Sequence, residues 1–280
     1  MNKWTIKELS RQVHVIEWNV DKPSEECTIL LMSDEHWDNK ECDRDLLRRH
    51  HEEAVKKGAP ILKFGDTFCA MQGKWDKRAD MNQLRPEHHT NKYLDSLVNT
   101  ATEWYKPYKD NIALITPGNH EQSILDRHET DLIDRLTSHL GIAKGDYWGY
   151  VLLRLKSRER TQTHVLHYHH GYGGGGEVTR GMIDNNRTRG QYDADLFYSG
   201  HIHRRNYDEN VITTVTAQGR LTQRTQRFLR GSTYKNETRG WHASGGRAGR
   251  PLGGWWVTIR DKNVSREEGH QLMVTCTPAT

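Results

Sequence analysis

The sequence predicts an α/β fold, and three observations support this class. Over the first two thirds of the chain, short apolar runs alternate with segments of helical periodicity, as in strands joined by helices. Beyond residue 210 the helical periodicity gives way to Thr-, Val- and Trp-rich segments broken by glycine, which are typical of strands and loops. The composition, with 34% hydrophobic and 28% charged residues, suits a folded globular protein. We expect residues 1–280 to form a single domain, because no repeat and no Pro/Ser-rich linker divides them.

The first half of the chain is expected to contain three strands separated by two helices. The expected strands are the apolar runs 27–33, 60–64 and 112–117. The expected helices, 43–57 and 86–105, repeat apolar residues at three- and four-residue spacing, so that one face of each can pack on a sheet. These faces consist of Leu46, Leu47, His50 and Ala54 in the first helix and Tyr93, Leu94, Leu97, Val98, Ala101 and Tyr105 in the second.

The second half is expected to begin with a helix and to continue mainly as strands. Helical spacing of Leu125, Ile133, Leu136 and Leu140 predicts a helix over 123–139. The next apolar runs are expected to be strands, and they are 150–155, 163–168 and 195–199.

Polar side chains follow five of the expected strands. Because the carboxyl ends of strands in α/β folds meet at one edge, residues far apart in sequence can form a site there. Carboxylate, amide and imidazole groups without a thiolate suit divalent ions such as Mn, Fe or Zn. Together the five segments therefore predict a two-metal site. They are Asp34-x-His36, Gly65-Asp66, Gly118-Asn119-His120-Glu121, His170-Gly171 and Gly200-His201-x-His203.

Each segment alone also has a purely structural explanation. Gly65-Asp66 fits a turn, Asn119 fits the cap of a following helix, and the pair His201 and His203 fits two hydrogen-bonded surface residues. Their joint occurrence, each at the end of a strand, favours the site.

With these motifs the chain resembles the calcineurin-like metallophosphoesterase superfamily, whose motif series runs D-x-H, G-D, G-N-H-E/D, H and G-H-x-H. The resemblance spans residues 34–203. It implies an αββα sandwich of two mixed β-sheets flanked by helices, with a dimetal site at the strand ends. It also implies that His120 lies beside the metals without binding them. The ligand sets that it implies are Asp34, His36 and His203 for one ion, Asn119, His170 and His201 for the other, and Asp66 as the bridge between them.

The chemistry of a phosphoester hydrolase gives each residue type a reason. Two cations about 3.5–4 Å apart can share one hydroxide and clamp the oxygens of a phosphoryl group. Asp66 offers two anionic oxygens to bridge them, and the neutral Asn119 leaves the site with positive charge for an anionic substrate. His120 can give a proton to the leaving oxygen, a contribution typically worth about 10²–10⁴-fold. The expected cofactors are two divalent ions, Mn, Fe, Zn or Ni, with Mn favoured.

Two details of the motifs differ from the simplest pattern. His169 and His170 both lie at the fourth motif, and either could be its metal ligand. His170 is preferred as the ligand because the ligand of the superfamily usually directly precedes glycine. Residues 65–69 (GDTFC) lack the D-R-G continuation of the superfamily's serine/threonine protein phosphatases, which argues against a phosphoprotein substrate. Glu35 and Asp38 are expected either to face solvent or to support the ligands.

The C-terminal part, residues 204–280, is expected to be rich in strands and basic. Residues 204–260 contain eleven Lys/Arg against three acids, which suits either a phosphate-bearing partner or a solvated positive face. Trp241, Trp255 and Trp256 interleave with these arginines, as in proteins that stack the bases of single-stranded nucleic acid. The alternative is that one of the adjacent tryptophans faces the core.

Residues outside the motifs predict two further features. The segment 67–92, with Lys74, Trp75 and Arg78, is expected to form either a cap over the substrate or a surface excursion. Glycines 171 and 173–176 lack the Gly-Lys-Ser/Thr of a phosphate-binding P-loop and suggest a mobile lip beside the site.

The cellular setting is expected to be the cytoplasm. The first twenty residues contain no uninterrupted apolar stretch of the kind found in signal peptides. The sequence also contains no run of about 18 apolar residues, so we expect no membrane as a partner. The four cysteines contain no CxxC pair, so we expect reduced thiols.

The expected function is metal-dependent hydrolysis of a phosphoester, with a phosphodiester of nucleic acid or nucleotides as the favoured substrate, as in a nuclease. The alternatives are a phosphomonoesterase, a phosphodiesterase of small cyclic nucleotides and, in a different class, a non-catalytic metal-binding scaffold. The presence of His120 argues against the scaffold, which needs no acid next to its metals.

Overall fold

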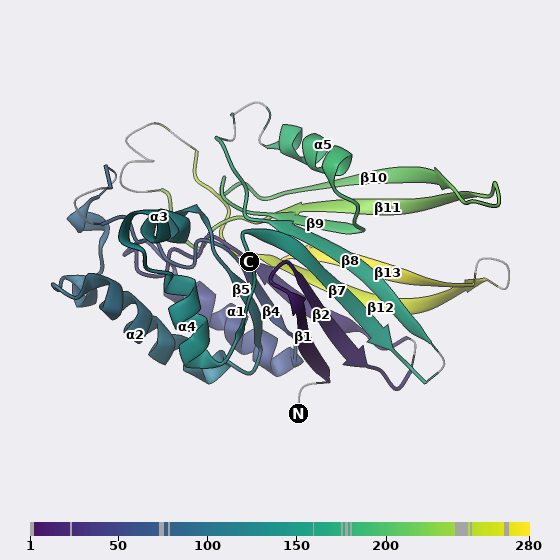
Figure 1. Ribbon diagram of the computed structural model, residues 1–280, viewed down its shortest axis with the longest axis horizontal. Helices are drawn as coiled ribbons and strands as arrows, with labels where there is room; N and C mark the ends of the chain where they lie inside the picture. The colour runs from purple at the N-terminus through teal and green to yellow at the C-terminus, as the bar shows by residue number, and fades with distance from the viewer. Residues whose placement is uncertain are drawn as a thin grey trace.

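Two mixed β-sheets lie face to face in this protein, and helices flank their outer faces (Figure 1). This arrangement confirms the expected α/β class with two mixed sheets and flanking helices. Lys74, Trp75, Arg78 and Trp241, which the sequence analysis singled out, lie outside the part that the structure describes. The computed structural model describes residues 3–22, 24–72, 76–77, 79–158, 160–174, 176, 179, 181–238, 246, 248–265 and 269–280.

The six-stranded sheet contains all three strands expected in the first half of the chain. Its neighbouring strands β3, β4 and β5 run parallel, so their carboxyl ends lie at one edge. The C-terminal hairpin β12–β13 extends the sheet, with β12 antiparallel to β3. The order is β13 (Gly269–Pro278), β12 (Trp255–Ser265), β3 (Cys27–Met32), β4 (Ile61–Phe64), β5 (Ile112–Thr116) and β6 (Ala143–Lys144).

The seven-stranded sheet contains the strands expected at 150–155, 163–168 and 195–199 together with two strands from the N-terminus. The N-terminal pair β1 and β2 was not expected from the sequence. Strands β8 and β9 run parallel, so they also end side by side. The order is β1 (Trp4–Ser10), β2 (Val13–Asn19), β7 (Trp148–Lys156), β8 (Thr161–His169), β9 (Leu196–Ser199), β11 (Leu221–Arg230) and β10 (Asn206–Val215).

The α-helices lie on two sides of the sheet pair (Figure 1). Helices α1 (Arg44–Lys57), α2 (Tyr93–Tyr105), α3 (Asn119–His128) and α4 (Leu132–Leu140) lie on the side of the six-stranded sheet. Helix α5 (Met182–Gln191), which the sequence analysis did not identify, lies beside β9–β11 of the seven-stranded sheet. Among the described residues, no helix combines the length and the apolar character needed to cross a membrane. Short 3₁₀ helices occupy Met81–Gln83, Pro86–His88 and Lys106–Tyr108.

Two expected helices differ from the observed ones. The helix expected over 86–105 begins only at Tyr93, because Pro86–His88 form a 3₁₀ turn that ends at His89, whose ψ of 69° is not helical. The buried ring of His88 lies 5.7 Å from that of Trp37. The helix expected over 123–139 is two helices. Glu129 adopts a left-handed φ of 51°, and the side chain of Asp131 accepts the N–H of Asp134 at 2.8 Å, which starts α4.

Two hydrophobic cores hold the layers together, and β12 contributes to both. Trp256 packs in the core between the six-stranded sheet and the helices, and Trp255 packs in the core between the two sheets. Their exposed fractions are 7% and 4%, because successive side chains of a strand point to opposite faces and both faces of β12 are covered. The prediction that these two tryptophans stack on nucleic-acid bases is therefore wrong.

Several basic residues in the described C-terminal part are engaged within the protein. Arg224 pairs with Asp195 at 3.1 Å, and Arg227 pairs with Glu209 at the same distance. Arg230 is 2% exposed and donates to the carbonyl of Gly181 at 3.0 Å. The local excess of arginine therefore does not form a free positive face over these residues.

Candidate metal centre

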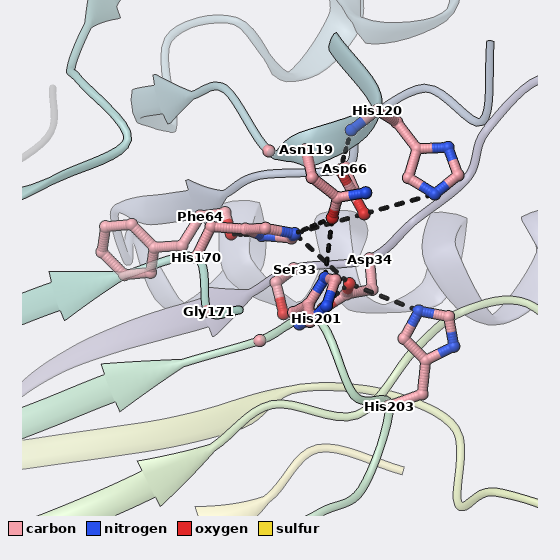
Figure 2. A network of polar contacts seen from close by, with 12 residues as sticks. Ser33, Asp34, Phe64, Asp66, Asn119, His120, His170, Gly171, His201 and His203 are labelled. Carbon is pink, nitrogen blue, oxygen red and sulfur yellow. Dashed lines mark hydrogen bonds and ion pairs between the residues drawn. The ribbon is translucent and has the colours of Figure 1, made fainter. Parts of the chain in front are cut away.

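Seven candidate ligands meet where the carboxyl ends of strands from both sheets come together. Figure 2 shows these residues except His36, which it does not label. The six-stranded sheet contributes the residues that follow β3, β4 and β5, and the seven-stranded sheet contributes those that follow β8 and β9. The convergence of parallel strand ends thus brings together residues separated by up to 169 positions in the sequence. These residues are Asp34, His36, Asp66, Asn119, His170, His201 and His203.

The first ligand group consists of Asp34, His36 and His203. The Nε2 atom of His203 lies 3.3 Å from Oδ1 of Asp34 and 3.1 Å from Nε2 of His36. One ligand atom from each residue lies within 4.8 Å of the others, a spacing that suits a single cation. This is the set that the resemblance to metallophosphoesterases implies for one ion, and the binding of an ion there stays a prediction.

The second ligand group consists of Asp66, Asn119, His170 and His201. The Nε2 atom of His170 lies 3.2 Å from Oδ2 of Asp66 and 3.1 Å from Oδ1 of Asn119. The same amide oxygen lies 2.7 Å from Nδ1 of His201. His169, the alternative to His170, instead accepts the N–H of Gly171 at 2.9 Å through its Nδ1.

The two ligand groups are adjacent. Oδ1 of Asp34, in the first group, lies 4.0 Å from Nε2 of His170, in the second. The carboxylate of Asp66 lies beside His170, and a bridge from Asp66 to both ions stays a prediction.

The hydrogen bonds of three histidines leave acceptor atoms facing one another. His170 donates from Nδ1 to the carbonyl of Phe64 at 2.9 Å, and His201 donates from Nε2 to the carbonyl of Gly173 at 2.9 Å. His203 donates from Nδ1 to Oε1 of Glu237 at 2.5 Å. In its neutral form each ring therefore turns the lone pair of its other nitrogen toward a carboxylate or amide oxygen. A cation between these atoms satisfies all of them, so the residues present fit divalent ions.

The buried carboxylates create a strong negative field at the same place. Burial alone would lower the pKa of His170, but the charges of Asp66 and Asp34 outweigh it and raise the pKa to about 10. Burial likewise opposes protonation of His203, while Asp34 and Glu237 raise its pKa to about 9. The site therefore attracts positive charge, which a divalent ion supplies when it binds.

The backbone of the site is strained. A left-handed φ is unusual outside glycine and costs on the order of 1–3 kcal/mol when the residue does not favour it. Such outliers persist where the surrounding structure holds them, and they gather at functional sites. Five candidate ligands adopt this conformation, with φ of 55° at Asp34, 47° at His36, 50° at Asp66, 72° at His201 and 54° at His203.

Two glycines allow the site loops to approach one another. A Cβ atom on Gly65, whose φ is +88°, would lie 2.7 Å from Cγ of His170 and 2.8 Å from the backbone of Gly118. A Cβ atom on Gly118 would lie 2.8 Å from Cγ of Asp66 and closer still to its backbone nitrogen. The glycines of the motifs are therefore required by packing.

Replacing Gly118 with alanine is expected to displace Asp66 and to lower the stability by about 1–3 kcal/mol, the usual cost of an overpacked site. Metal content and thermal unfolding measure the two effects. Gly190→Ala is the control, because a Cβ there meets nothing within 4 Å and lies in α5, where alanine favours the helix by up to about 1 kcal/mol. Equal metal content in the two variants would contradict the packing argument.

His120 lies beside the second ligand group. Its Nδ1 donates to the carbonyl of Cys69, and its Nε2 faces Oδ2 of Asp66 at 3.7 Å. The side chain is 11% exposed, so part of the ring lies at the protein surface. The motif residues include no thiolate, yet Sγ of Cys69 lies within 4.8 Å of ring nitrogens of His36 and His120. Burial raises the pKa of the Cys69 thiol to about 12, which keeps it neutral.

Glu121, the last residue of the GNHE motif, ties two ligand loops together. Its buried carboxylate accepts the N–H groups of Phe68 at 2.7 Å, Gly118 at 2.8 Å and Asp66 at 3.2 Å. Asn119 is thus the first residue of α3 rather than its cap, and its side chain is left to face the histidines. This function of Glu121 was not expected from the sequence, although its place in the GNHE motif was a signal for it.

Buried charges support the loop of the first ligand group. Glu35, which lies between two candidate ligands, forms an ion pair with Lys63 of β4 at 3.0 Å and accepts the hydroxyl of Tyr105. Asp38 accepts the N–H of Ala70 at 3.0 Å and also that of Cys69. Neither acid faces solvent, so the solvent-facing alternative for both is wrong.

The described part of the segment 67–92 lies against the same loop. Leu84 forms a β-bridge with Asn39, and Nε of Arg85 donates to the carbonyl of Asn39 at 3.0 Å. The segment therefore lies next to the ligand loops, and its action as a cap stays a prediction.

Comparisons with known proteins give only distant similarities. No protein-family model and no curated protein matches the sequence. GAP50, the anchor in the inner membrane complex of Plasmodium, aligns at 8% identity over 91% of this chain and 85% of its own, with a TM-score of 0.46. Vps29 of Chaetomium thermophilum aligns at 9% identity over 90% and 96%, with a TM-score of 0.38. A metallophosphoesterase of Sphaerobacter thermophilus aligns at 12% identity over 90% and 87%, with a TM-score of 0.35. At these values the alignments assign no family, and the function has to be argued from the geometry of the site.

Proposed function

We propose that the protein is a metal-dependent phosphoesterase that binds two divalent cations and hydrolyses phosphodiesters of nucleic acids or nucleotides. The observation that carries this proposal is the pair of adjacent ligand groups, linked by the 4.0 Å approach of Asp34 and His170. The five strained ligand positions and the resemblance of the motifs to those of metallophosphoesterases add support. The proposal places the ions in the two groups described above, with Mn favoured.

The ligand set suits an anionic substrate. Two divalent ions supply Lewis acidity, activation of a water molecule and a clamp for the phosphoryl oxygens when bound. Asp34 and Asp66 are the carboxylates among the seven residues, so together they provide less negative charge than two divalent ions carry. The site therefore retains net positive charge toward a phosphate.

His120 is the proposed general acid. The carbonyl of Cys69 holds its Nδ1, which directs Nε2 toward the ligand groups. Protonated at Nε2, the ring can donate to the leaving oxygen, which has to accept a proton as the phosphorus–oxygen bond breaks.

Removal and replacement of metal ions test the proposal. Chelation with EDTA is expected to abolish hydrolysis of bis-p-nitrophenyl phosphate, and Mn is expected to restore it ahead of Zn, Ni or Fe. Ion binding is also expected to raise the melting temperature, since a ligand at 100 times its Kd stabilises the folded state by about 2.7 kcal/mol.

A substrate panel separates the alternatives. Activity on p-nitrophenyl phosphate alone would establish the phosphomonoesterase, and activity on 2′,3′-cyclic nucleotides alone would establish the small-substrate diesterase. Salt-sensitive cleavage of single-stranded DNA would support the nuclease. Metal-loaded protein that hydrolyses none of these substrates would contradict an enzymatic function.

A further inference from the structure

The segment after β11, residues 231–238, lies against the first ligand group. The backbone carbonyl of Asp34 accepts two hydrogen bonds from this segment, from Oγ1 of Thr233 at 2.8 Å and from the N–H of Tyr234 at 3.0 Å. The peptide that carries the first candidate ligand is thereby fixed to the chain just before Glu237. This segment lies outside the motifs recognised in the sequence.

Glu237 presents a buried carboxylate to His203. The residue is 3% exposed, and its Oε1 accepts the Nδ1–H of His203 at 2.5 Å. Its other oxygen lies 3.7 Å from Nε of Arg250. With the proton held on Nδ1, the lone pair on Nε2 is directed toward Asp34 and His36.

The corresponding hydrogen bonds of His170 and His201 are accepted by main-chain carbonyls rather than by a side chain. His170 donates to the carbonyl of Phe64, and His201 donates to the carbonyl of Gly173. Substitution of a side chain does not remove those acceptors. Among these three rings, His203 is held by a side chain, so its orientation can be tested with a single substitution.

We propose that Glu237 is the positioning residue of the first ligand group. It holds His203 in the tautomer and orientation in which Nε2 faces an ion shared with Asp34 and His36. The carboxylate also makes the ring a stronger donor to that ion. The inference rests on the proposed function, because it concerns one of the two proposed ions.

The test measures the binding of both ions by equilibrium dialysis and titration calorimetry in the full chain. Wild-type protein is expected to bind two Mn ions. Glu237→Ala is expected to weaken one of them by about 10–100-fold, the usual cost of losing such a partner, and to leave the other unchanged. In electron paramagnetic resonance, the coupled signal of two Mn ions is expected to give way to that of a single ion. Glu237→Gln is expected to lose less affinity, because its amide oxygen still accepts the hydrogen bond of His203.

Arg250→Met is the matched control. This variant removes the ion pair with Glu237 but leaves the contact with His203, so it is expected to retain both ions at wild-type affinity. If it weakens one ion as much as Glu237→Ala does, Glu237 only anchors the loop and the inference is overturned. Wild-type affinities in both Glu237 variants overturn it as well.

Two further outcomes are distinguishable. If wild-type protein binds no divalent ion, the proposed function fails and the inference fails with it. If Glu237→Ala does not fold, as judged by thermal unfolding in EDTA, the glutamine variant carries the test, and wild-type affinity for both ions in that variant overturns the inference.

Discussion

Asp66→Asn is expected to abolish turnover and to reduce the content of bound metal. The carboxylate accepts the backbone N–H of His120 at 3.0 Å through Oδ1 and faces His170 at 3.2 Å through Oδ2. An amide keeps the size of the side chain but replaces one anionic oxygen with an N–H donor, which repels a cation. Bound metal ions are expected to lower the activation free energy by several kcal/mol, so their loss is expected to lower kcat by at least about 10³-fold.

Elemental analysis beside steady-state kinetics checks this prediction. Asp195→Asn is the matched control, because this carboxylate also lies near an imidazole, 3.7 Å from Nδ1 of His164, at the end of β9 opposite to His201. It is expected to retain both ions. An Asp66→Asn protein with two ions and wild-type kcat would refute the role of Asp66 and weaken the proposed two-metal centre.

His120→Ala is expected to retain both ions and to lose about 10²–10⁴-fold in kcat, as expected for removal of a general acid. Its ring donates to the carbonyl of Cys69, lies 3.7 Å from Asp66 and packs edge to face against His36, but it belongs to neither ligand group, so truncation is expected to leave the seven candidate ligands in place. The loss should depend on the leaving group. It should be large for an alkoxide, which needs a proton, and small for p-nitrophenolate, which departs as an anion.

The leaving-group series distinguishes acid catalysis from a structural effect. A structural defect would lower the rate for every substrate by the same factor and would reduce the metal content. His128→Ala is the control, because this histidine lies at the end of the same helix, α3, away from the ligand groups. Equal losses for alkyl and nitrophenyl esters would rule out His120 as the acid.

The sequence predicted the elements whose signals are local. Strands β3, β4 and β5 are short apolar runs, and the motif residues that follow them meet because parallel strands end at one edge. The break between α3 and α4 was missed because the apolar spacing continues across Glu129, whose backbone conformation the spacing does not report. Helix α5 was missed because its sequence, MIDNNRTRGQ, has few apolar residues.

The supporting residues of the site could not be predicted because their partners are distant in sequence. Glu35 pairs with Lys63 across two strands, and Glu237 reaches His203 from 34 positions away. Burial of both Trp255 and Trp256 depends on β12 lying inside the layers, which the alternation of side chains along a strand does not reveal. Such pairs become visible only when the tertiary structure is known.

The hydrogen bonds between Asp34 and the segment at Thr233 have a consequence for biosynthesis. These two residues are 199 positions apart. Strand β3 likewise cannot pair with β12 until that strand has been synthesised. At a typical rate of 5–20 residues per second, a ribosome needs about 10–40 s to make the intervening chain. During that interval the nascent Asp34 loop lacks its anchor, so the proposed cation site of the first ligand group can form only after residue 233 has been synthesised.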